Sequence, residues 1–220
     1  MRMLVVSALI VVCDQVTKLL VKGFSVPILG LQVEGMKFGT SRPILGDFLR
    51  LTFVENPGMA FGIDLGGKLF FSIFTLLASV AIFIYFLSMK STAAPYRFSL
   101  AMILGGAFGN LIDRVFYDAF FNEGPLFYGK VVDFIDVDFF DVTLFGYHLS
   151  RWPVFNIADA SVTVGVILML FVHRSVQEEI SPSAEAAGLS SPDPGNGEQS
   201  ELSLQDAISS PDNPSTPTQL

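Results

Sequence analysis

Asp133 and Asp159 lie far apart in the chain, and each has apolar neighbours. If the fold brings them together, the two carboxyl groups could share a proton. Asp133 stands in the run VVDF, and Asp159 ends the run FNIAD and is followed by thirteen uncharged residues. Burial raises the pKa of a carboxyl group, and a second carboxylate beside it raises one of the two further. Such a pair can do acid/base work on an attacking water and a leaving amine without a metal or a protein nucleophile.

Further charged and polar residues interrupt apolar stretches, where an ionisable group is costly unless it is paired or functional. Asp14 and Lys18 are four residues apart, so they can pair on one helix face; neutralisation near the interface and a role in the site stay open. Asn110, Asp113 and Arg114 share a helix face by their spacing. They could anchor a helix bundle internally or contact a substrate. Asn156 shares a face with Asp159 in the same way.

Two other kinds of chemistry receive less support. Asp133 is followed by three more acids that could bind calcium or magnesium, but the residues between them are bulky rather than the Gly and Asn of a metal loop, so we expect no metal; these acids are Asp136, Asp138 and Asp141. A nucleophile activated by histidine is not expected, since His148 and His173 fall on opposite membrane faces and no histidine lies near Cys13.

The composition indicates an α-helical membrane protein, because 51% of the residues are hydrophobic and only 15% are charged. Four apolar stretches are long enough to cross a bilayer as helices, at about 3–21, 69–89, 98–116 and 154–172. Arg2 and the apolar run up to Cys13 could also form a signal peptide, but Val12 stands where signal processing needs a small residue, so we expect a retained helix. Residues 1–174 should form one membrane domain.

Counting the crossings places both long connections, 22–68 and 117–153, on one face of the membrane together with the intramembrane charges. Segment 22–68 should form a small β-rich platform. The basic residues at the opposite helix ends favour an extracytoplasmic platform and cytoplasmic termini. Gly105, Gly106 and Gly109 fit close helix packing better than a phosphate loop. Residues 175–220 hold eight acidic and no basic residues and should form a disordered tail. No basic footprint for nucleic acid is present.

The sequence resembles the lipoprotein signal peptidases, also called signal peptidase II, a family of bacterial membrane aspartic proteases. The resemblance covers nearly all of 14–172 and rests on five runs in family order: DQVTK from Asp14, NPGMAF from Asn56, GNLIDR from Gly109, VVDF from Val131 and FNIAD from Phe155. Each run alone would be weak, but five together are specific.

The resemblance implies removal of the signal peptide from a diacylglyceryl-modified prolipoprotein, before the lipidated cysteine, at the outer face of the cytoplasmic membrane. It implies that Asp133 and Asp159 are the catalytic pair. Asn56, Asn110, Arg114 and Asn156 match polar residues around the pair that hold substrate or backbone, whereas Asp14, Lys18 and Asp113 match supporting positions. No cofactor is implied. The resemblance also implies inhibition by the cyclic peptide antibiotic globomycin and contact with membrane lipid.

Two features depart from the family, and two other functions remain as alternatives. The connections before Val131 and before Phe155 look longer than the family norm, and the acidic tail matches nothing in it. Membrane carboxylates would also suit a small proton-coupled transporter, but their clustering on one face leaves the other half of the bundle dry. A non-catalytic assembly protein would show no turnover. We expect a monomer, although the sequence does not fix the oligomeric state.

Overall fold

The computed structural model describes residues 2–58, 67–89, 94–138, 142–144, 147–149 and 151–186, with the backbone alone over 142–144, 147–149 and 173–186. The MAF part of the NPGMAF run and Asp141 lie outside these residues. The chain divides into two units, Met1–Arg174 and Ser175–Leu220. Every residue proposed for the site belongs to the first unit.

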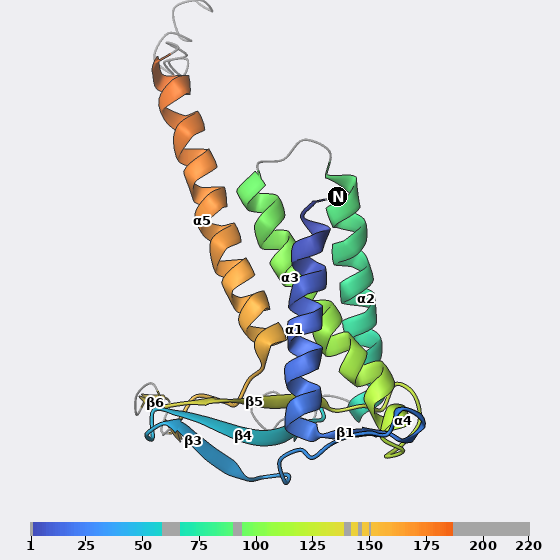
Figure 1. Ribbon diagram of the computed structural model, residues 1–220. Coiled ribbons are helices and arrows are strands. Elements are labelled where there is room, and N and C mark those ends of the chain that lie inside the picture. Colours follow the sequence, from blue (N-terminus) through green and yellow to red (C-terminus); the bar gives the residue numbers. More distant parts are fainter. Residues whose placement is uncertain are drawn as a thin grey trace, which may run out of the picture. The chain divides into compact units, whose positions relative to one another are not determined.

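Four long helices and a set of short strands make up the first unit (Figure 1). The helices are α1 (Leu4–Lys22), α2 (Gly67–Ser88), α3 (Ala94–Ile112) and α5 (Ile157–Ala186), the last of which runs on past residue 174. A π-helical turn, η2 (Asp113–Tyr117), and the short helix α4 (Asp118–Phe120) continue α3. Among the described residues, three helical segments are long and apolar enough to cross a membrane, Leu4–Lys22, Gly67–Ser88 and Ala94–Phe120, and Ile157–Val172 is a shorter apolar helix.

Three helix boundaries differ from those expected, each for a local reason. Helix α3 begins four residues early, at Ala94, because Pro95 suits the first turn of a helix, where its missing N–H costs nothing. Helix α5 begins at Ile157 rather than at 154, because Phe155 pairs with a strand instead. The expectation of a disordered tail from residue 175 is wrong up to Ala186. Lengthening an existing helix is easier than starting one, and Gln177, Glu178 and Glu179 are good helix formers.

The strands form a platform at the end of α1 and the start of α5, and β5 passes beneath the helices (Figure 1). Antiparallel strands β3 (Ser41–Leu45), β4 (Leu49–Asn56) and β5 (Val131–Val137) make a three-stranded sheet. Two separate two-stranded sheets complete the platform. The first pairs β1 (Phe24–Val26) with β2 (Leu31–Val33), which are joined by the 3-10 turn η1 (Pro27–Leu29). The second pairs β6 (Val142–Leu144) with β7 (Tyr147–Leu149). The expected β-rich segment is therefore present, and it recruits β5 from the second long connection.

Glycines on α3 let two other helices approach its backbone. A Cβ atom added to Gly105 would lie 2.9 Å from the Ile10 side chain on α1, and one added to Gly106 would lie 2.3 Å from the backbone oxygen of Ala158 on α5. The interpretation of these glycines as packing residues is confirmed. Their close contacts fix where α1 and α5 meet α3.

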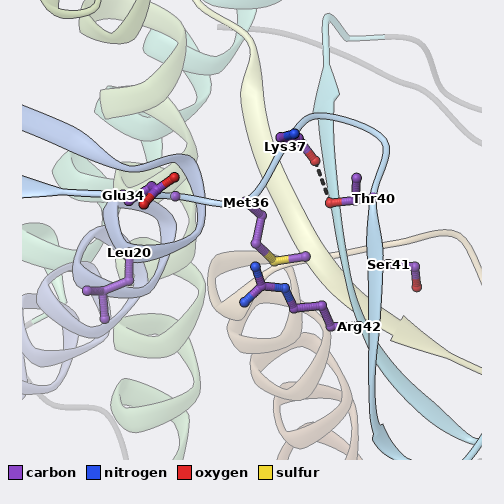
Figure 2. A pocket seen from close by; sticks show the side chains of 8 residues that line it. Leu20, Glu34, Met36, Lys37, Thr40, Ser41 and Arg42 are labelled. Atoms are coloured by element: carbon purple, nitrogen blue, oxygen red, sulfur yellow. Dashed lines mark hydrogen bonds between the residues drawn. The ribbon is translucent and has the colours of Figure 1, made fainter.

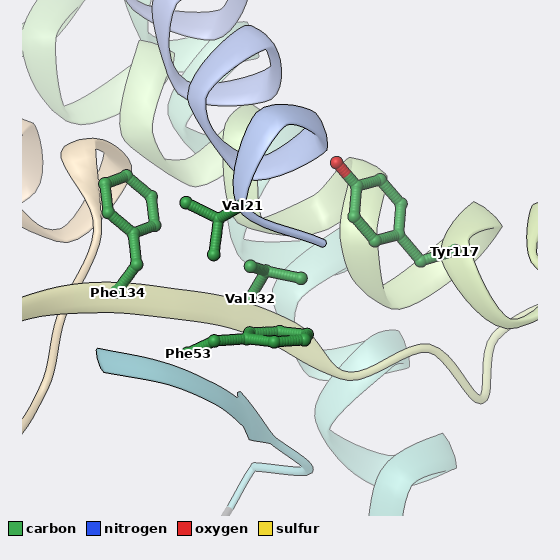
Figure 3. Close-up of a cluster of buried hydrophobic side chains, with 5 residues drawn as sticks. All are labelled: Val21, Phe53, Tyr117, Val132 and Phe134. Carbon is green, nitrogen blue, oxygen red and sulfur yellow. The ribbon is translucent and has the colours of Figure 1, made fainter. Parts of the chain in front are cut away.

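An apolar cluster joins the helix ends to the platform (Figure 3). Val21 from α1, Phe53 from β4 and Tyr117 from η2 are buried together with Val132 and Phe134 of β5. Side chains of a strand alternate between its two faces. Because Val132 and Phe134 both belong to the cluster, Asp133 between them belongs to the other face of β5.

Candidate active site

Asp159 lies in the first turn of α5 and helps to cap that helix. The Asn156 side-chain oxygen accepts a hydrogen bond from the Asp159 backbone N–H at 2.9 Å, and Asp159 Oδ2 accepts one from the Asn156 backbone N–H at 3.3 Å. This reciprocal arrangement satisfies two backbone donors that a helix start leaves free. The carboxylate is therefore held at the helix N-terminus, where the helix dipole favours a negative charge.

Amide side chains connect this helix start to Asp133 on β5. The buried Asn156 donates through Nδ2 to Asp133 Oδ1 at 2.6 Å, and Asn110 on α3 donates to Asp159 Oδ1 at 2.7 Å. The Asn110 oxygen in turn accepts a hydrogen bond from Asn156 at 3.2 Å. Asn56, at the end of β4, also hydrogen-bonds to Asp133. The two carboxylates are thus joined by a continuous set of amides.

The Asp133 carboxyl group is shielded from water, with only 3% of the residue exposed. This burial, and after it the charge of Asp159, raises the pKa of Asp133 from 3.8 to about 7, against hydrogen bonds from Asn156 and Asn56 that act to lower it. Near neutral pH the group can therefore hold a proton or release it. A carboxyl group with such a pKa can serve as a general acid.

Lys18 lies at the centre of a buried ionic cluster next to the two aspartates. Its ammonium nitrogen is 2.8 Å from Asp14 Oδ2 and 2.8 Å from Asp113 Oδ2, and all three side chains are inaccessible to water. Lys18 also donates to the Asn110 oxygen at 2.9 Å. The one buried cation thus pairs with two carboxylates. This pairing explains why the three charges are tolerated within apolar helices.

Each carboxylate of the cluster also holds the backbone next to a candidate catalytic residue. Asp14 Oδ1 accepts from the backbone N–H of Ala158 at 2.9 Å, directly before Asp159. Asp113 Oδ2 accepts from the backbone N–H of Val132 at 3.1 Å, directly before Asp133. The cluster therefore positions the segments that carry both aspartates, in addition to pairing its buried charges.

Arg114 is half-buried, and two of its nitrogens lack partners. Nε and Nη1 are inaccessible to water and have no hydrogen-bond partner within the described part of the chain. The guanidinium carbon lies 5.7 Å from the centre of the Phe71 ring, and the charges of Asp113, Asp133 and Asp159 act on the group. A buried donor without a partner is uncommon. Arg114 is therefore suited to donate hydrogen bonds to an oxygen atom of a bound molecule.

Gln15 contacts the same cluster, although only Asp14 and Lys18 were predicted from this part of the helix. Its amide donates to Asp113 Oδ1 at 2.8 Å and to the Gly109 carbonyl at 3.0 Å, and its oxygen accepts from the Tyr117 hydroxyl at 3.0 Å. The signal that could have found it is a polar amide within an apolar helix, one residue after Asp14.

Two of the acids that follow Asp133 bind a cation of the chain itself. Arg151 donates to Asp136 Oδ1 at 2.7 Å and to Asp138 Oδ2 at 3.1 Å, and Thr52 donates to Asp136 Oδ2 at 2.6 Å. Among the residues that the structure describes, no group of three or more histidine, cysteine or acidic side chains could hold a metal ion. Asp136 and Asp138 therefore have a role in fixing the platform.

The predicted site residues fall into two connected groups. Asn56, Asn110, Asp133, Asn156 and Asp159 are linked by the hydrogen bonds given above, and Asp14, Lys18 and Asp113 form the ionic cluster behind them. Arg114 is near both groups without a hydrogen bond from Nε or Nη1 to either. Residues from α1, α3, β4, β5 and α5 thus meet at the platform ends of the helices.

Comparison with known proteins gives a consistent result. Residues 6–174 match the sequence profile of a family described as signal peptidase (SPase) II. The chain is 36% identical over 169 residues to the lipoprotein signal peptidase of Chlorobium phaeobacteroides strain BS1, covering 76% of this chain and 93% of that protein. It is 37% identical to that of Caldanaerobacter subterraneus subsp. tengcongensis, with coverages of 76% and 91%.

A solved structure described as a bacterial membrane enzyme is similar in fold. It superposes with a TM-score of 0.59 at 32% sequence identity and covers 81% of this chain and 90% of its own. The chain is therefore a protease of the signal peptidase II family, the lipoprotein signal peptidases, which remove signal peptides from prolipoproteins.

Proposed function

We propose that Asp133 and Asp159 form the catalytic dyad and hydrolyse a peptide bond by activating water. The observation that carries the proposal is the double role of Asn156, which donates to the Asp133 carboxylate and caps the helix turn that holds Asp159. Two carboxyl groups arranged in this way, one of them with a pKa of about 7, can hold one proton between them. That is the requirement for acid/base hydrolysis by a carboxyl pair.

The proton begins on Asp133, because burial favours its neutral form. Asp159, held at a helix N-terminus, begins ionised and takes a proton from water as the water oxygen attacks the scissile carbonyl carbon. Asp133 gives its proton to the carbonyl oxygen. When the tetrahedral intermediate collapses, Asp159 gives its proton to the leaving amine and Asp133 recovers its own.

Arg114 and Asn56 hold the peptide backbone on either side of the scissile bond. Arg114 offers two buried donors without partners in the described part of the chain, and a substrate carbonyl oxygen would satisfy them. Asn56 is tied at one end to the Gly58 backbone N–H at 2.9 Å, so its amide has a fixed direction. Asn110 holds Asp159 in place, and Asp14, Lys18 and Asp113 support both aspartates.

The bundle crosses the cytoplasmic membrane four times, with residues 157–172 of α5 as the fourth crossing. The platform and the dyad are on the extracytoplasmic face and both termini are in the cytoplasm. Support comes from the basic residues that flank the predicted crossings in the sequence at the ends opposite the two long connections: Arg2, Lys90, Arg97 and Arg174. Residues 1–174 form the peptidase domain, and 175–220 form an acidic cytoplasmic tail.

The substrate is a prolipoprotein that carries a diacylglyceryl group on its cysteine, and the bond broken is the one before that cysteine. The signal helix enters laterally between the helices while the lipid stays in the bilayer. The scissile bond then lies at the membrane boundary, where the dyad is. A globomycin-like cyclic peptide would occupy the same site, and the enzyme acts as a monomer.

The test is cleavage of a purified diacylglyceryl precursor in detergent with a chelator present. We expect cleavage by the unchanged protein and none by Asp133→Asn or Asp159→Asn, with precursor binding and thermal stability retained. Asp47→Asn serves as a matched control, because that carboxylate is 84% exposed on the platform. Cleavage by either dyad variant would refute the proposal, and loss of cleavage caused by the chelator would support metal catalysis instead.

A further inference from the structure

A hollow of about 580 Å³ that plays no part in the candidate site opens beside the end of α1 (Figure 2). Leu20 of α1 forms one side, the segment from Glu34 to Lys37 forms another, and Arg42 extends into it from β3. None of the residues assigned to the dyad or its supporting cluster lines this hollow. Its chemistry can therefore be considered separately from peptide hydrolysis.

Close backbone contacts fix the hollow at the level of the last turn of α1. The Met36 backbone N–H donates to the Val21 carbonyl at 2.7 Å. Gly23 and Gly35 allow the crossing, since a Cβ atom on Gly35 would lie 2.3 Å from the Lys22 backbone. Helix α1 has 19 residues, so it is about 28 Å long and its last turn falls at the edge of the roughly 30 Å hydrocarbon layer.

An exposed apolar stripe on α1 leads to the hollow. The residues of the stripe follow helical spacing, which places them on one face, and each is between 49% and 59% exposed: Val5, Leu9, Val12, Val16 and Leu20. Leu20 ends the stripe and lines the hollow. An acyl chain lying along this stripe would bring its headgroup to the hollow.

Two cations line the hollow in which such a headgroup would lie. Neither Lys37 nor Arg42 forms a side-chain hydrogen bond or an ion pair with any residue in the described ranges. Glu34 lines the same hollow, so its charged side chains leave one net positive charge. A lysine and an arginine without partners, at the boundary of the hydrocarbon layer, match the charge of a lipid phosphate.

We propose that this hollow binds the headgroup of an anionic phospholipid, with its phosphate between Lys37 and Arg42 and one acyl chain along Val16 and Leu20. The lipid belongs to the leaflet on the platform side and is separate from the diacylglyceryl group of the substrate. It anchors the 34–42 segment, and with it β3, to the membrane surface.

The test measures lipid binding to the purified protein in detergent by native mass spectrometry. Dioleoyl phosphatidylglycerol should bind at least tenfold more tightly than dioleoyl phosphatidylcholine, which has the same acyl chains and no net charge. The variant Lys37→Gln/Arg42→Gln should lose this preference, whereas Arg50→Gln should keep it, because Arg50 is already paired with Asp47. Glu34→Gln should strengthen the preference, a gain that misfolding cannot produce.

Three results would overturn the proposal: equal binding of the two lipids, a preference that survives in the double variant, or displacement of the lipid by glycerol phosphate at matched concentration. The last would assign the hollow to a soluble phosphate. Precursor cleavage and melting temperature, measured on the same samples, report whether each variant is folded. The lipid measurement does not depend on the dyad, so either proposal can fail while the other stands.

Discussion

The Asn156 side chain donates to the Asp133 carboxylate at 2.6 Å while its oxygen caps the first turn of α5. The two roles can be separated by substitution. Asn156→Ser retains an oxygen that caps well but is too short to bridge to β5. We expect it to leave the melting temperature nearly unchanged and to lower kcat at least tenfold.

Asn156→Ala provides the comparison, because it removes both the cap and the bridge. It should cost about 1 kcal/mol of stability and lower kcat as much as Asn156→Ser does. Thermal unfolding in detergent and single-turnover cleavage of a precursor measure the two effects. Full activity in Asn156→Ser would show that the contact with Asp133 has no role in catalysis.

Lys18 should be among the most sensitive residues to substitution in the protein. Lys18→Met leaves the carboxylates of Asp14 and Asp113 buried without their cation, and breaking a buried ion pair costs about 3–5 kcal/mol. The double variant Lys18→Met/Asp113→Asn should recover part of that loss, because one of the two uncompensated charges is removed. Chemical unfolding of the single and double variants measures the coupling. A double variant that is less stable than Lys18→Met would contradict the ionic explanation.

Asp133 makes stability depend on pH in a defined direction. Burial and the charge of Asp159 raise its pKa from 3.8 to about 7, so between these values the folded protein binds a proton that the unfolded chain releases. The stabilisation is complete below about pH 4 and is lost as the pH rises through about 7. Asp133→Asn cannot ionise. We therefore expect its melting temperature to match that of the unchanged protein at pH 4 and to exceed it above pH 7.

The same group sets the pH dependence of cleavage in the proposed mechanism. Because Asp133 must begin protonated, kcat/KM should fall about tenfold per pH unit above pH 7. Initial rates between pH 5 and 9, with melting temperatures recorded at each pH, measure this. A rate that is constant up to pH 9 would mean that the proton is not held by Asp133.

The general arrangement could be predicted from the sequence because hydropathy and charge position are properties of the residues themselves. Counting crossings was enough to expect Asp133 and Asp159 on one face of the bundle. The start of α5 was missed because Val154 and Phe155 are apolar, and an apolar residue fits a buried strand pairing as well as a helix. The capping pair Asn156 and Asp159 was the local signal for the true start.

Contacts that depend on the final geometry could not be predicted in this way. The π-helical turn at Asp113–Tyr117 follows no hydropathy pattern, yet such turns often occur at functional sites. The partners of Arg151 on β5 were not predicted, because ion pairs between segments depend on where the chain folds back. The structure brings the polar residues predicted for the site together, and it adds Gln15, whose contacts with Asp113 and Tyr117 depend on how α1 packs against the end of α3.

Arg151 should act on the site through the segment that leads into α5. Its guanidinium binds Asp136, Asp138 and the Asp47 backbone oxygen, and four residues later Phe155 pairs with Ile135 on β5. Arg151→Gln should therefore lower both the melting temperature and kcat, the latter severalfold. Arg151→Lys should only partly restore them, because a lysine cannot reproduce the forked geometry.

Arg50→Gln is the matched control for that experiment, since its pair with Asp47 is exposed on the platform and such pairs contribute little. Precursor cleavage and thermal unfolding of the three variants can be compared directly. Equal effects of Arg50→Gln and Arg151→Gln would show that the charge of the platform matters rather than the position of the 151–156 segment.

Gly106 connects helix packing to the position of Asp159. A Cβ atom there would lie 2.3 Å from the Ala158 backbone oxygen, and a backbone atom in the first turn of α5 cannot move without moving the next residue, Asp159. Gly106→Ala should therefore cost about 1–3 kcal/mol through overpacking and should also lower kcat. Gly105→Ala is the graded comparison, because its nearest neighbours, Ile10 Cβ at 2.9 Å and the Ser7 backbone oxygen at 3.0 Å, belong to α1 and are less close than the Ala158 oxygen is to Gly106. If both variants lose stability equally but only Gly106→Ala loses activity, the contact with α5 sets the geometry of the dyad; if both keep full activity, the position of Asp159 tolerates more movement than the proposed mechanism allows.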